Sequence, residues 1–367
     1  MMAELHINAK IILRNIQKLD EFLKKNNIKW TLVTKILSGN RDVLEVILNS
    51  QVIDNCHSIG DSRLSNLKII KEIRPDIITM YIKLPSINSV RSVVKYADIS
   101  LNSSFNMIKA LNQEAVAQNK IHKVIVMIEM GELREGVIRD NLLNFYEKVF
   151  GLTNIDIIGI GTNLGCMYGV EPTYDKLIQL SLYEQILEAK FNRNIELISG
   201  GSSITLPLIG RKRIPLNINH FRVGEAAFMG TSPLTNKKFK QLSTSAFEFK
   251  ANIIEVALKE VAPDGVIGIG NVGHVLKPSD LDDAGKTYRI ILDFGIVDVN
   301  ADHLSVNNDF LTFSGTTSDM TVYSLDKSFV DSKLFTEFKV GDKISFKPDY
   351  MAVARLMNTG YIDKIVK

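Results

Sequence analysis

The chain has 367 residues, 45% hydrophobic and 23% charged, which is enough for two domains with sizeable cores. Its 44 basic and 41 acidic residues leave a net charge of +3, a balance that argues against nucleic acid as the main partner. Two cysteines are too few for a disulfide framework, no signal peptide is evident, and no apolar run approaches the roughly 20 residues that span a bilayer. We therefore expect a soluble, cytoplasmic protein.

The first informative element is the apolar run that ends at Lys35. Residues 30–35 include β-branched side chains, and they are followed by a Gly-containing turn at 38–40 and by helical spacing at 42–48. This order predicts strand, loop and helix, which puts Lys35 at the carboxyl end of the first strand of an α/β protein. A partly desolvated lysine there can lose its proton and act as a base or Schiff-base nucleophile. Taken alone, a solvated loop lysine is the alternative.

The same alternation continues to about residue 225. Seven further strand-like runs lie at residues 52–56, 76–82, 98–101, 123–129, 155–160, 195–199 and 218–223. Segments with helical spacing separate them, at residues 64–73, 108–118, 142–150 and 174–190. Alternating strands and helices predict parallel βαβ units, and eight of them match a closed (β/α)8 barrel. A doubly wound open sheet is the alternative.

The pattern changes near residue 240. Short strand-like runs separated by turn residues occur at 247–257, 266–270, 288–294, 311–313 and 343–346, with no convincing long helix between them. The sequence therefore predicts an α/β fold in two domains. A TIM-like (β/α)8 barrel covers residues 8–240, and a mainly β domain covers residues 241–367.

The loops after the strands define the expected active mouth of the barrel. The loops after the seventh and eighth strands, Gly200–Ser203 and Arg222–Glu225, combine glycines with hydroxyls at the place where barrels often bind phosphate. Together with Lys35 they predict pyridoxal phosphate, with the lysine holding the aldehyde. Arg222 cannot give up its proton, so beside the ring nitrogen it would keep that nitrogen unprotonated and favour simple proton transfer. A salt bridge inside the barrel is the alternative for Arg222.

These motifs resemble those of the alanine racemase superfamily, the fold-type III pyridoxal phosphate enzymes. Within it they are most similar to the group of ornithine racemases and broad-specificity amino-acid racemases. The resemblance covers nearly the whole chain, and it is carried by Val33–Lys35, Asp61–Arg63, Ile128–Gly136, Gly200–Ser203 and Phe221–Glu225.

The resemblance implies roles for individual residues. Lys35 would hold the cofactor aldehyde and serve as base on one face of the substrate, and Arg222 would pair with the ring nitrogen. Arg134 would neighbour the ring hydroxyl and the substrate carboxylate, while Asn163 falls where alanine racemases carry a histidine beside the ring. The residues implied for the phosphate are Ser202, Ser203, Gly224 and Glu225, the last two through backbone N–H groups, with Tyr361 as a looser match.

The sequence departs from the alanine racemase pattern in several places. Gly39 stands where those enzymes have a tyrosine, and Met127 stands where many have a modified lysine. Their second base, a tyrosine from the partner subunit, has no clear counterpart here. His274 and Asp319 are the candidates for that face, although a solvated loop histidine remains the alternative for His274. We expect no metal site, because no tight His/Cys cluster is present.

The resemblance implies an amino-acid racemase that interconverts L and D forms by two-base transfer of the α-proton. The expected substrate is ornithine or another basic amino acid, whose distal ammonium could be received by Glu132, Glu135 or Asp319. The expected assembly is a homodimer with active sites shared between subunits, in which Glu4–Ile7 pairs with the β domain. Alanine racemisation, metal-assisted aldol cleavage and a non-catalytic pyridoxal-phosphate-binding protein of the same fold are the alternatives.

Overall fold

The computed structural model describes residues 2–266, 285–325 and 338–367 and divides into two compact parts. One part is the continuous segment Ala9–Thr244, and the other joins Met1–Asn8 to Ser245–Lys367. His274 and most of the strand predicted at residues 266–270 lie outside the described residues. Within the ranges that are described, no helix is both long and apolar enough to cross a membrane.

A closed barrel of eight parallel strands forms the first part and confirms the predicted fold class. In barrel order the strands are β2 (Lys29–Val33), β3 (Ser58–Asp61), β4 (Thr79–Tyr81), β5 (Ile99–Asn102), β6 (His122–Met127), β7 (Ile155–Gly161), β8 (Leu197–Ser202) and β9 (His220–Val223). Pairing of β9 with β2 closes the ring, with Thr31 opposite Arg222. The first and last strands of the barrel are therefore neighbours.

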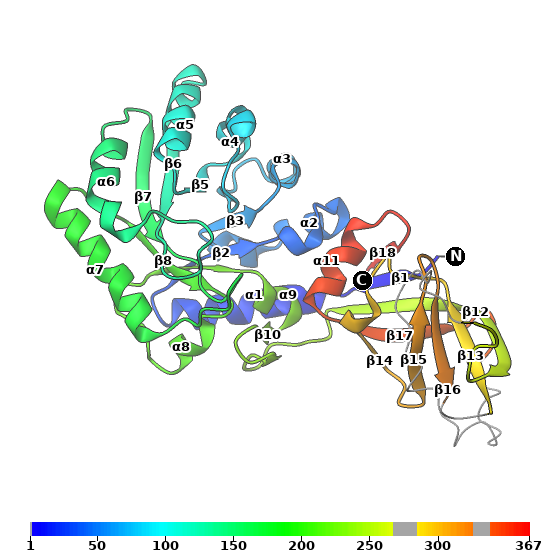
Figure 1. The fold of residues 1–367 in the computed structure, drawn as a ribbon. Helices are drawn as coiled ribbons and strands as arrows, with labels where there is room; N and C mark the ends of the chain where they lie inside the picture. The colour runs from blue at the N-terminus through cyan, green and yellow to red at the C-terminus, as the bar shows by residue number, and fades with distance from the viewer. Residues whose placement is uncertain (1, 267–284, 326–337) are drawn as a thin grey trace. The chain divides into compact units, whose positions relative to one another are not determined.

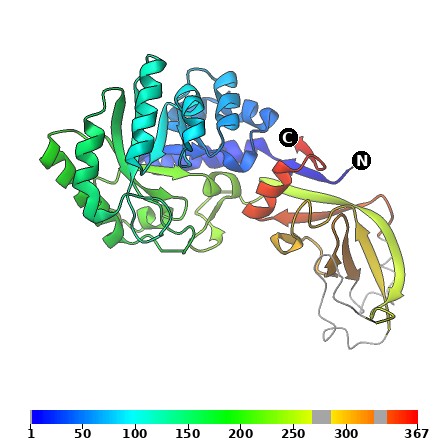
Figure 2. The same ribbon diagram turned by 45° about the horizontal axis from the view of Figure 1, so that its top comes forward.

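Helices form the outer layer around these strands in both ribbon views (Figures 1 and 2). They are α1 (Ala9–Lys24), α2 (Arg41–Leu48), α3 (Leu64–Ile73), α4 (Val90–Tyr96), α5 (Phe105–Ala117), α6 (Leu142–Phe150), α7 (Tyr174–Phe191), α8 (Leu206–Gly210) and α9 (Glu225–Met229). The first helix shows why they pack this way. Its Ile12, Ile16, Leu19 and Leu23 recur at helical spacing and are fully buried on one face.

The predicted strand at residues 52–56 is wrong. Residues Gln51–Asn55 form a 3₁₀ turn, and the second barrel strand, β3, begins at Ser58. Cys56 and His57 therefore lie before the strand. The real strand reads Ser-Ile-Gly-Asp, and at Gly60 the barrel interior has no room for a side chain. A Cβ on Gly60 would lie 2.8 Å from Thr31 Cγ2 and 3.0 Å from Ile82 Cγ2.

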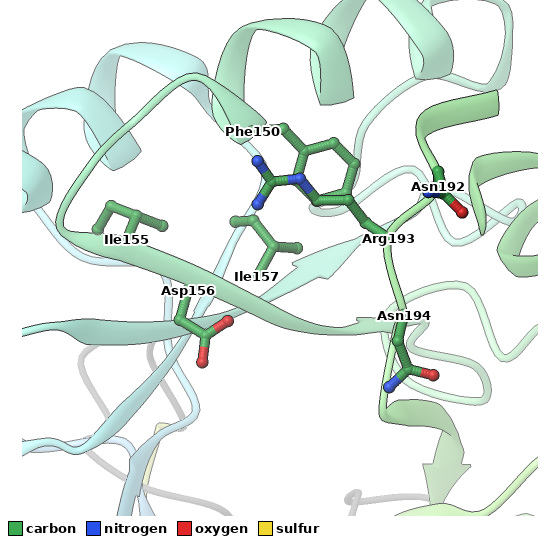
Figure 3. A pocket seen from close by; sticks show the side chains of 7 residues that line it. All are labelled: Phe150, Ile155, Asp156, Ile157, Asn192, Arg193 and Asn194. Carbon is green, nitrogen blue, oxygen red and sulfur yellow. The ribbon is translucent and has the colours of Figure 1, made fainter.

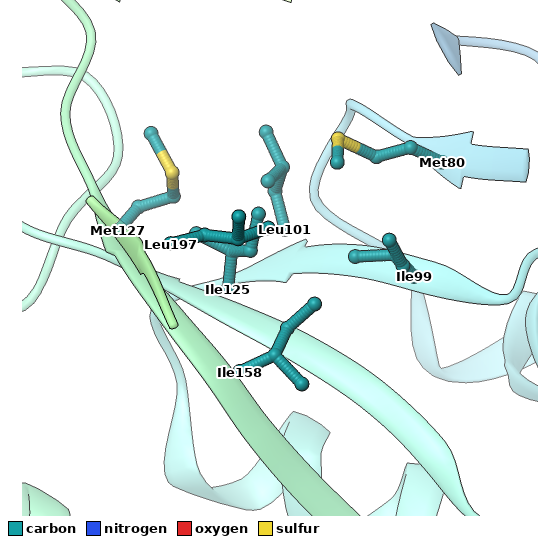
Figure 4. Packing of buried hydrophobic residues seen from close by; sticks show 7 residues of the cluster. All are labelled: Met80, Ile99, Leu101, Ile125, Met127, Ile158 and Leu197. Carbon is teal, nitrogen blue, oxygen red and sulfur yellow. The ribbon is translucent and has the colours of Figure 1, made fainter. Parts of the chain in front are cut away.

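One side of the barrel interior is apolar. Figure 4 shows the cluster, whose members are Met80, Ile99, Leu101, Ile125, Met127, Ile158 and Leu197. Met127, the residue at the modified-lysine position, is fully buried among them and contributes packing alone. The polar side chains of the interior gather instead on β2, β3, β8 and β9, where the candidate site residues begin.

The second part is mainly antiparallel β structure. Its strands are β1 (Glu4–Ile7), β12 (Phe247–Glu260), β13 (Lys286–Leu292), β14 (Leu304–Val306), β15 (Leu311–Thr316), β16 (Thr321–Leu325), β17 (Lys343–Pro348) and β18 (Asp363–Val366). The sheet order is β14-β17-β12-β13-β16-β15, and β1 pairs with both β12 and β18. Phe249, Phe294 and Phe346 form its aromatic core, with Phe249 and Phe294 edge to face at 5.1 Å.

A helix that the sequence did not suggest, α11 (Tyr350–Asn358), follows β17. Asp349 caps it by accepting a hydrogen bond from the Ala352 N–H at 2.9 Å. Ala352, Val353, Leu356 and Met357 form its buried face. Its short apolar stripe is a weak sequence signal for a helix. The capping residue Asp349 is the better sequence indicator that a helix begins here.

Candidate active site

Lys35 begins the loop that leaves β2 at the carboxyl end of the barrel, and its side chain is exposed. A buried carboxylate fixes the loop beneath it. The Thr34 hydroxyl donates to Asp61 Oδ2 at 3.0 Å, and Asp61 Oδ1 accepts from the Arg63 N–H and from Asn66 Nδ2. Burial raises the pKa of Asp61, while these hydrogen bonds oppose that shift. The motif at Asp61 therefore positions the lysine loop.

Gly39 closes the same loop and accounts for the absence of a tyrosine at that position. Its φ of +75° lies in the left-handed region, and a Cβ there would lie 2.5 Å from Asn66 Oδ1. Because Asn66 is itself held by Asp61, it cannot move aside without breaking that contact. The conformation and packing of this loop therefore require glycine at position 39, where alanine racemases have a tyrosine.

Arg222 lies inside the barrel on β9, the strand beside β2, and is only 5% exposed. Its guanidinium donates to three neutral acceptors, namely Ser199 Oγ, the Thr162 carbonyl at 2.7 Å and Asn163 Oδ1 at 2.9 Å. Burial lowers its pKa to about 10, so it stays charged at neutral pH. Among the described residues no carboxylate forms an ion pair with Arg222, so the salt-bridge alternative receives no support there.

A second layer of contacts joins Arg222 to the loop after β6. Asn163 donates through Nδ2 to Glu135, whose carboxylate also receives the Arg134 guanidinium. Arg134 Nη1 in addition donates to the Cys166 thiol sulfur at 2.7 Å. Three of the predicted cofactor residues, Arg134, Asn163 and Arg222, therefore belong to one continuous network, and Glu135 is its central carboxylate.

The segment predicted to bind phosphate is a bulge at the end of β8. Ser199 pairs with His220 and Ser202 with Arg222, so three steps along β8 face two along β9. Gly201 has a φ of +144°, and a Cβ there would lie 2.2 Å from Thr205 Oγ1. Ser203 Oγ accepts the Ala226 N–H at 3.1 Å, which ties this loop to the start of α9 beside Gly224 and Glu225.

Two observations test whether this loop fits a phosphate. The Thr205 hydroxyl is fully buried and has no hydrogen-bond partner among the described residues. The Ser203 hydroxyl already accepts one N–H and keeps its own proton to donate. A buried, unpartnered hydroxyl beside a glycine that cannot carry a side chain is the kind of cradle that a phosphate fills. Thr205 was absent from the sequence prediction, and its hydroxyl in the turn after Ser203 was the available signal.

Glu132, one of the acids predicted to receive a substrate ammonium, is already hydrogen-bonded within the protein. Its carboxylate is 2% exposed and accepts N–H groups from Cys166, Tyr168 and Val170 at 2.8 to 3.0 Å. Burial raises its pKa, but the backbone N–H groups outweigh that effect and hold the pKa below its ordinary value of 4.5. Glu132 therefore shapes the loop at residues 163–170.

Replacing Glu132 by glutamine should lower the melting temperature by about 5 °C, because a charge-assisted acceptor worth about 2 kcal/mol is lost. The folded-state pKa is depressed, so this stabilisation is present above pH 4.5 and disappears as the pH falls through the lower folded value. Thermal melts of wild type and variant should converge only once the pH has fallen below the depressed folded-state pKa of Glu132. Glu147→Gln, on the exposed face of α6, is the matched control and should leave the melting curve unchanged.

Two of the remaining predicted site residues lie in the second part of the chain, and the third is His274, which is not described. Asp319 is exposed in the tight turn between β15 and β16, where it accepts from the Ser318 hydroxyl at 2.7 Å. Tyr361 is 72% exposed just before β18. His303 pairs with Asp349 at 2.7 Å. In the described ranges no three His, Cys, Asp or Glu side chains form a group that could hold a metal ion.

A hollow at the other end of the barrel does not compete with this site. Figure 3 shows the side chains that line it, at the amino-terminal end of β7. The volume of the hollow is about 390 Å³. Its charged lining residues are Asp156 and Arg193, and the Arg193 guanidinium packs over the Phe150 ring at 5.3 Å. We assign this hollow to packing between α6 and the turn after α7.

Comparison with known proteins gives concordant results. The model of the family described as "Alanine racemase, N-terminal domain" matches residues 7–232. An ornithine racemase from Acetoanaerobium sticklandii is 33% identical over 99% of both chains, and a lysine racemase from Thermotoga maritima is 28% identical over 98% of this chain and 97% of the relative. The crystal structure of alanine racemase from Bartonella henselae with covalently bound pyridoxal phosphate covers all of both chains with a TM-score of 0.74 at 12% identity.

Proposed function

Because the chain belongs to the alanine racemase family, which the match to the N-terminal domain establishes, we propose that it is an amino-acid racemase dependent on pyridoxal phosphate. The substrate we propose is ornithine or another basic amino acid. The observation that carries the proposal is Arg222, a buried guanidinium held by neutral groups on the strand beside the loop of Lys35. Such a charge is costly to bury unless a ligand supplies a lone pair or an anion.

Residues suited to the phosphate and to the ring of the cofactor support this proposal. Ser202, Ser203 and Thr205, with the backbone at Gly224 and Glu225, would hold its phosphate, and Arg222 would donate to its ring nitrogen. Lys35 would hold its aldehyde from the loop after β2. Bound pyridoxal phosphate supplies an electron-withdrawing ring that acidifies the substrate Cα–H. Arg222 limits that effect because it leaves the ring nitrogen unprotonated, which favours proton transfer over other carbanion chemistry.

Racemisation needs one proton acceptor on each face of the substrate. Lys35 Nζ takes or returns the α-proton on one face. For the other face we propose a group from a second copy of the chain in a homodimer, with Asp319 and His274 as the candidates. The exposed turn that carries Asp319 is stiffened by the hydrogen bond between the Thr317 N–H and the Met320 carbonyl.

Two of the three acids that could receive the distal ammonium of a substrate already form hydrogen bonds within the protein. Glu132 is enclosed by backbone N–H groups, and Glu135 holds Arg134 and Asn163. Of the three acids named from the sequence, Asp319 is the one with an exposed carboxylate. We therefore favour Asp319 as the partner of a distal ammonium, which leaves His274 as the candidate for the second base.

A panel of single L-amino acids in deuterated water tests the function. The expected result is D-ornithine or D-lysine with deuterium at Cα, formed faster than D-alanine from L-alanine. Faster turnover of alanine would replace the substrate proposal, and cleavage products without D-isomer would overturn the racemase proposal. A yellow protein with no turnover of any amino acid would leave the non-catalytic cofactor-binding alternative. The predicted cytoplasmic location stays a prediction.

A further inference from the structure

Behind Arg222 a row of polar side chains runs down the barrel interior. Ser199 Oγ lies 2.8 Å from His220 Nδ1, and His220 Nε2 lies 3.0 Å from Thr31 Oγ1. Thr31 Oγ1 in turn lies 2.7 Å from Ser58 Oγ. Ser199, His220 and Thr31 are fully buried, and Ser58 is 1% exposed. The row comes from β8, β9, β2 and β3, so it spans the seam where the barrel closes.

Arg222 determines the direction of both hydrogen bonds that His220 makes in this row. A guanidinium can only donate, so Ser199 Oγ accepts from Arg222 Nη1 and must place its own proton elsewhere. The acceptor within reach is His220 Nδ1, which therefore carries no proton. The neutral ring then holds its proton on Nε2 and donates it to Thr31. Burial keeps the pKa of His220 well below its ordinary value, with His57, Arg222 and Lys29 adding to the shift.

We propose that His220, as the Nε2–H tautomer, is a positioning residue that holds Arg222 in place through Ser199. This inference rests on the proposed function, because Arg222 matters through the cofactor ring. A serine hydroxyl alone rotates freely, and His220 locks it with its lone pair toward Arg222. The guanidinium is thereby held by neutral groups, and among the described residues no carboxylate forms an ion pair with it. His220 was missed from the sequence although it precedes Arg222 by two, the spacing that puts both on one strand face.

The tautomer is testable in the wild-type protein without measuring activity. Long-range proton–nitrogen NMR of the protein with labelled histidine distinguishes Nδ1–H from Nε2–H forms. The expected signal is one neutral Nε2–H histidine, assigned to His220 by its loss in His220→Asn, that does not titrate between pH 5 and pH 8, a range around the ordinary histidine pKa of about 6.5. An Nδ1–H form, or titration near that value, would overturn the proposal.

Variants of the holoenzyme test the positioning role. His220→Leu should shift the absorption band of the bound cofactor and lower kcat about tenfold with little change in KM, because Arg222 loses its fixed orientation. His220→Asn keeps an acceptor for the Ser199 hydroxyl and should recover most of both properties. His122→Leu is the matched control, since His122 is another buried barrel histidine bonded to a serine, Ser100 Oγ at 2.7 Å. It should affect the melting temperature without moving the absorption band or kcat.

A double-mutant cycle with Ser199→Ala separates positioning from general destabilisation. If His220 acts through Ser199, adding His220→Leu to Ser199→Ala should cost less than threefold in kcat, far from the product of the single effects. Multiplying effects, or a His220→Leu variant that matches His122→Leu in spectrum and kcat, would refute the proposal. If His220→Leu does not fold, the NMR result and the Ser199→Ala spectrum still decide. A wild-type protein that binds no pyridoxal phosphate would instead refute the proposed function.

Discussion

Replacing Lys35 by alanine should abolish racemisation and leave the purified protein colourless. Lys35 is expected to supply both the covalent hold on the cofactor and the base on one face, so its loss removes two functions. The base alone is worth about 10² to 10⁴ in rate. Borohydride reduction of the wild type followed by peptide mass spectrometry should find the cofactor on the peptide that contains Lys35. Racemase activity should fall below detection.

The control for this experiment is Lys109→Ala, which removes an exposed lysine from α5 on the outside of the same barrel. It should keep the yellow colour and full activity. Lys35→Arg is a stricter variant, because arginine keeps the charge and cannot be deprotonated as a base. A Lys35→Ala protein that stays yellow and active would contradict the assignment of Lys35.

The barrel was predictable because its strands and helices alternate with strong periodicity. The helices α3 and α6, for example, begin and end at the residues predicted from their helical spacing. The strand β3 was not predictable, because Ser58 and Gly60 are small residues that give no apolar strand pattern. Gly60 faces Thr31 and Ile82 across the interior, and no pattern along the chain reports that crowding. The apolar Val52 and Ile53 nearby gave the stronger but misleading strand signal.

The candidate site likewise contains residues that the sequence predicts and residues that only the fold brings together. Lys35, Arg222 and the Gly200–Ser203 loop could be predicted because they occupy strand ends, where the barrel places chemistry. The partners of Arg222 could not, since Ser199, Asn163 and Glu135 come from separate strands and loops that only the closed barrel brings together. Glu132 shows the opposite error. Its sequence suggested a free acid for substrate, whereas three backbone N–H groups of the loop after β7 donate to its carboxylate.

Replacing Arg222 by glutamine should lower kcat by about 10² to 10³ while the fold persists, because a preorganised charged donor is lost from the mouth. The amide of glutamine can still donate to Asn163 or Thr162, so the network is weakened without leaving every acceptor unpaired. The ring nitrogen would lose its charged neighbour, so the absorption band of the bound cofactor should shift as well. Circular dichroism and the melting temperature should stay close to wild type.

Arg222→Lys separates charge from geometry. Lysine keeps a charge in solution, but it cannot bond Ser199, Thr162 and Asn163 in one plane as the guanidinium does. In this buried position, with neutral acceptors around it, a lysine would tend to lose its proton. We therefore expect Arg222→Lys to be almost as impaired in kcat as Arg222→Gln, with an activity that falls further as the pH rises. If Arg222→Lys retained wild-type kcat and spectrum, charge alone would suffice, and the positioning by Ser199 and His220 would have no catalytic purpose.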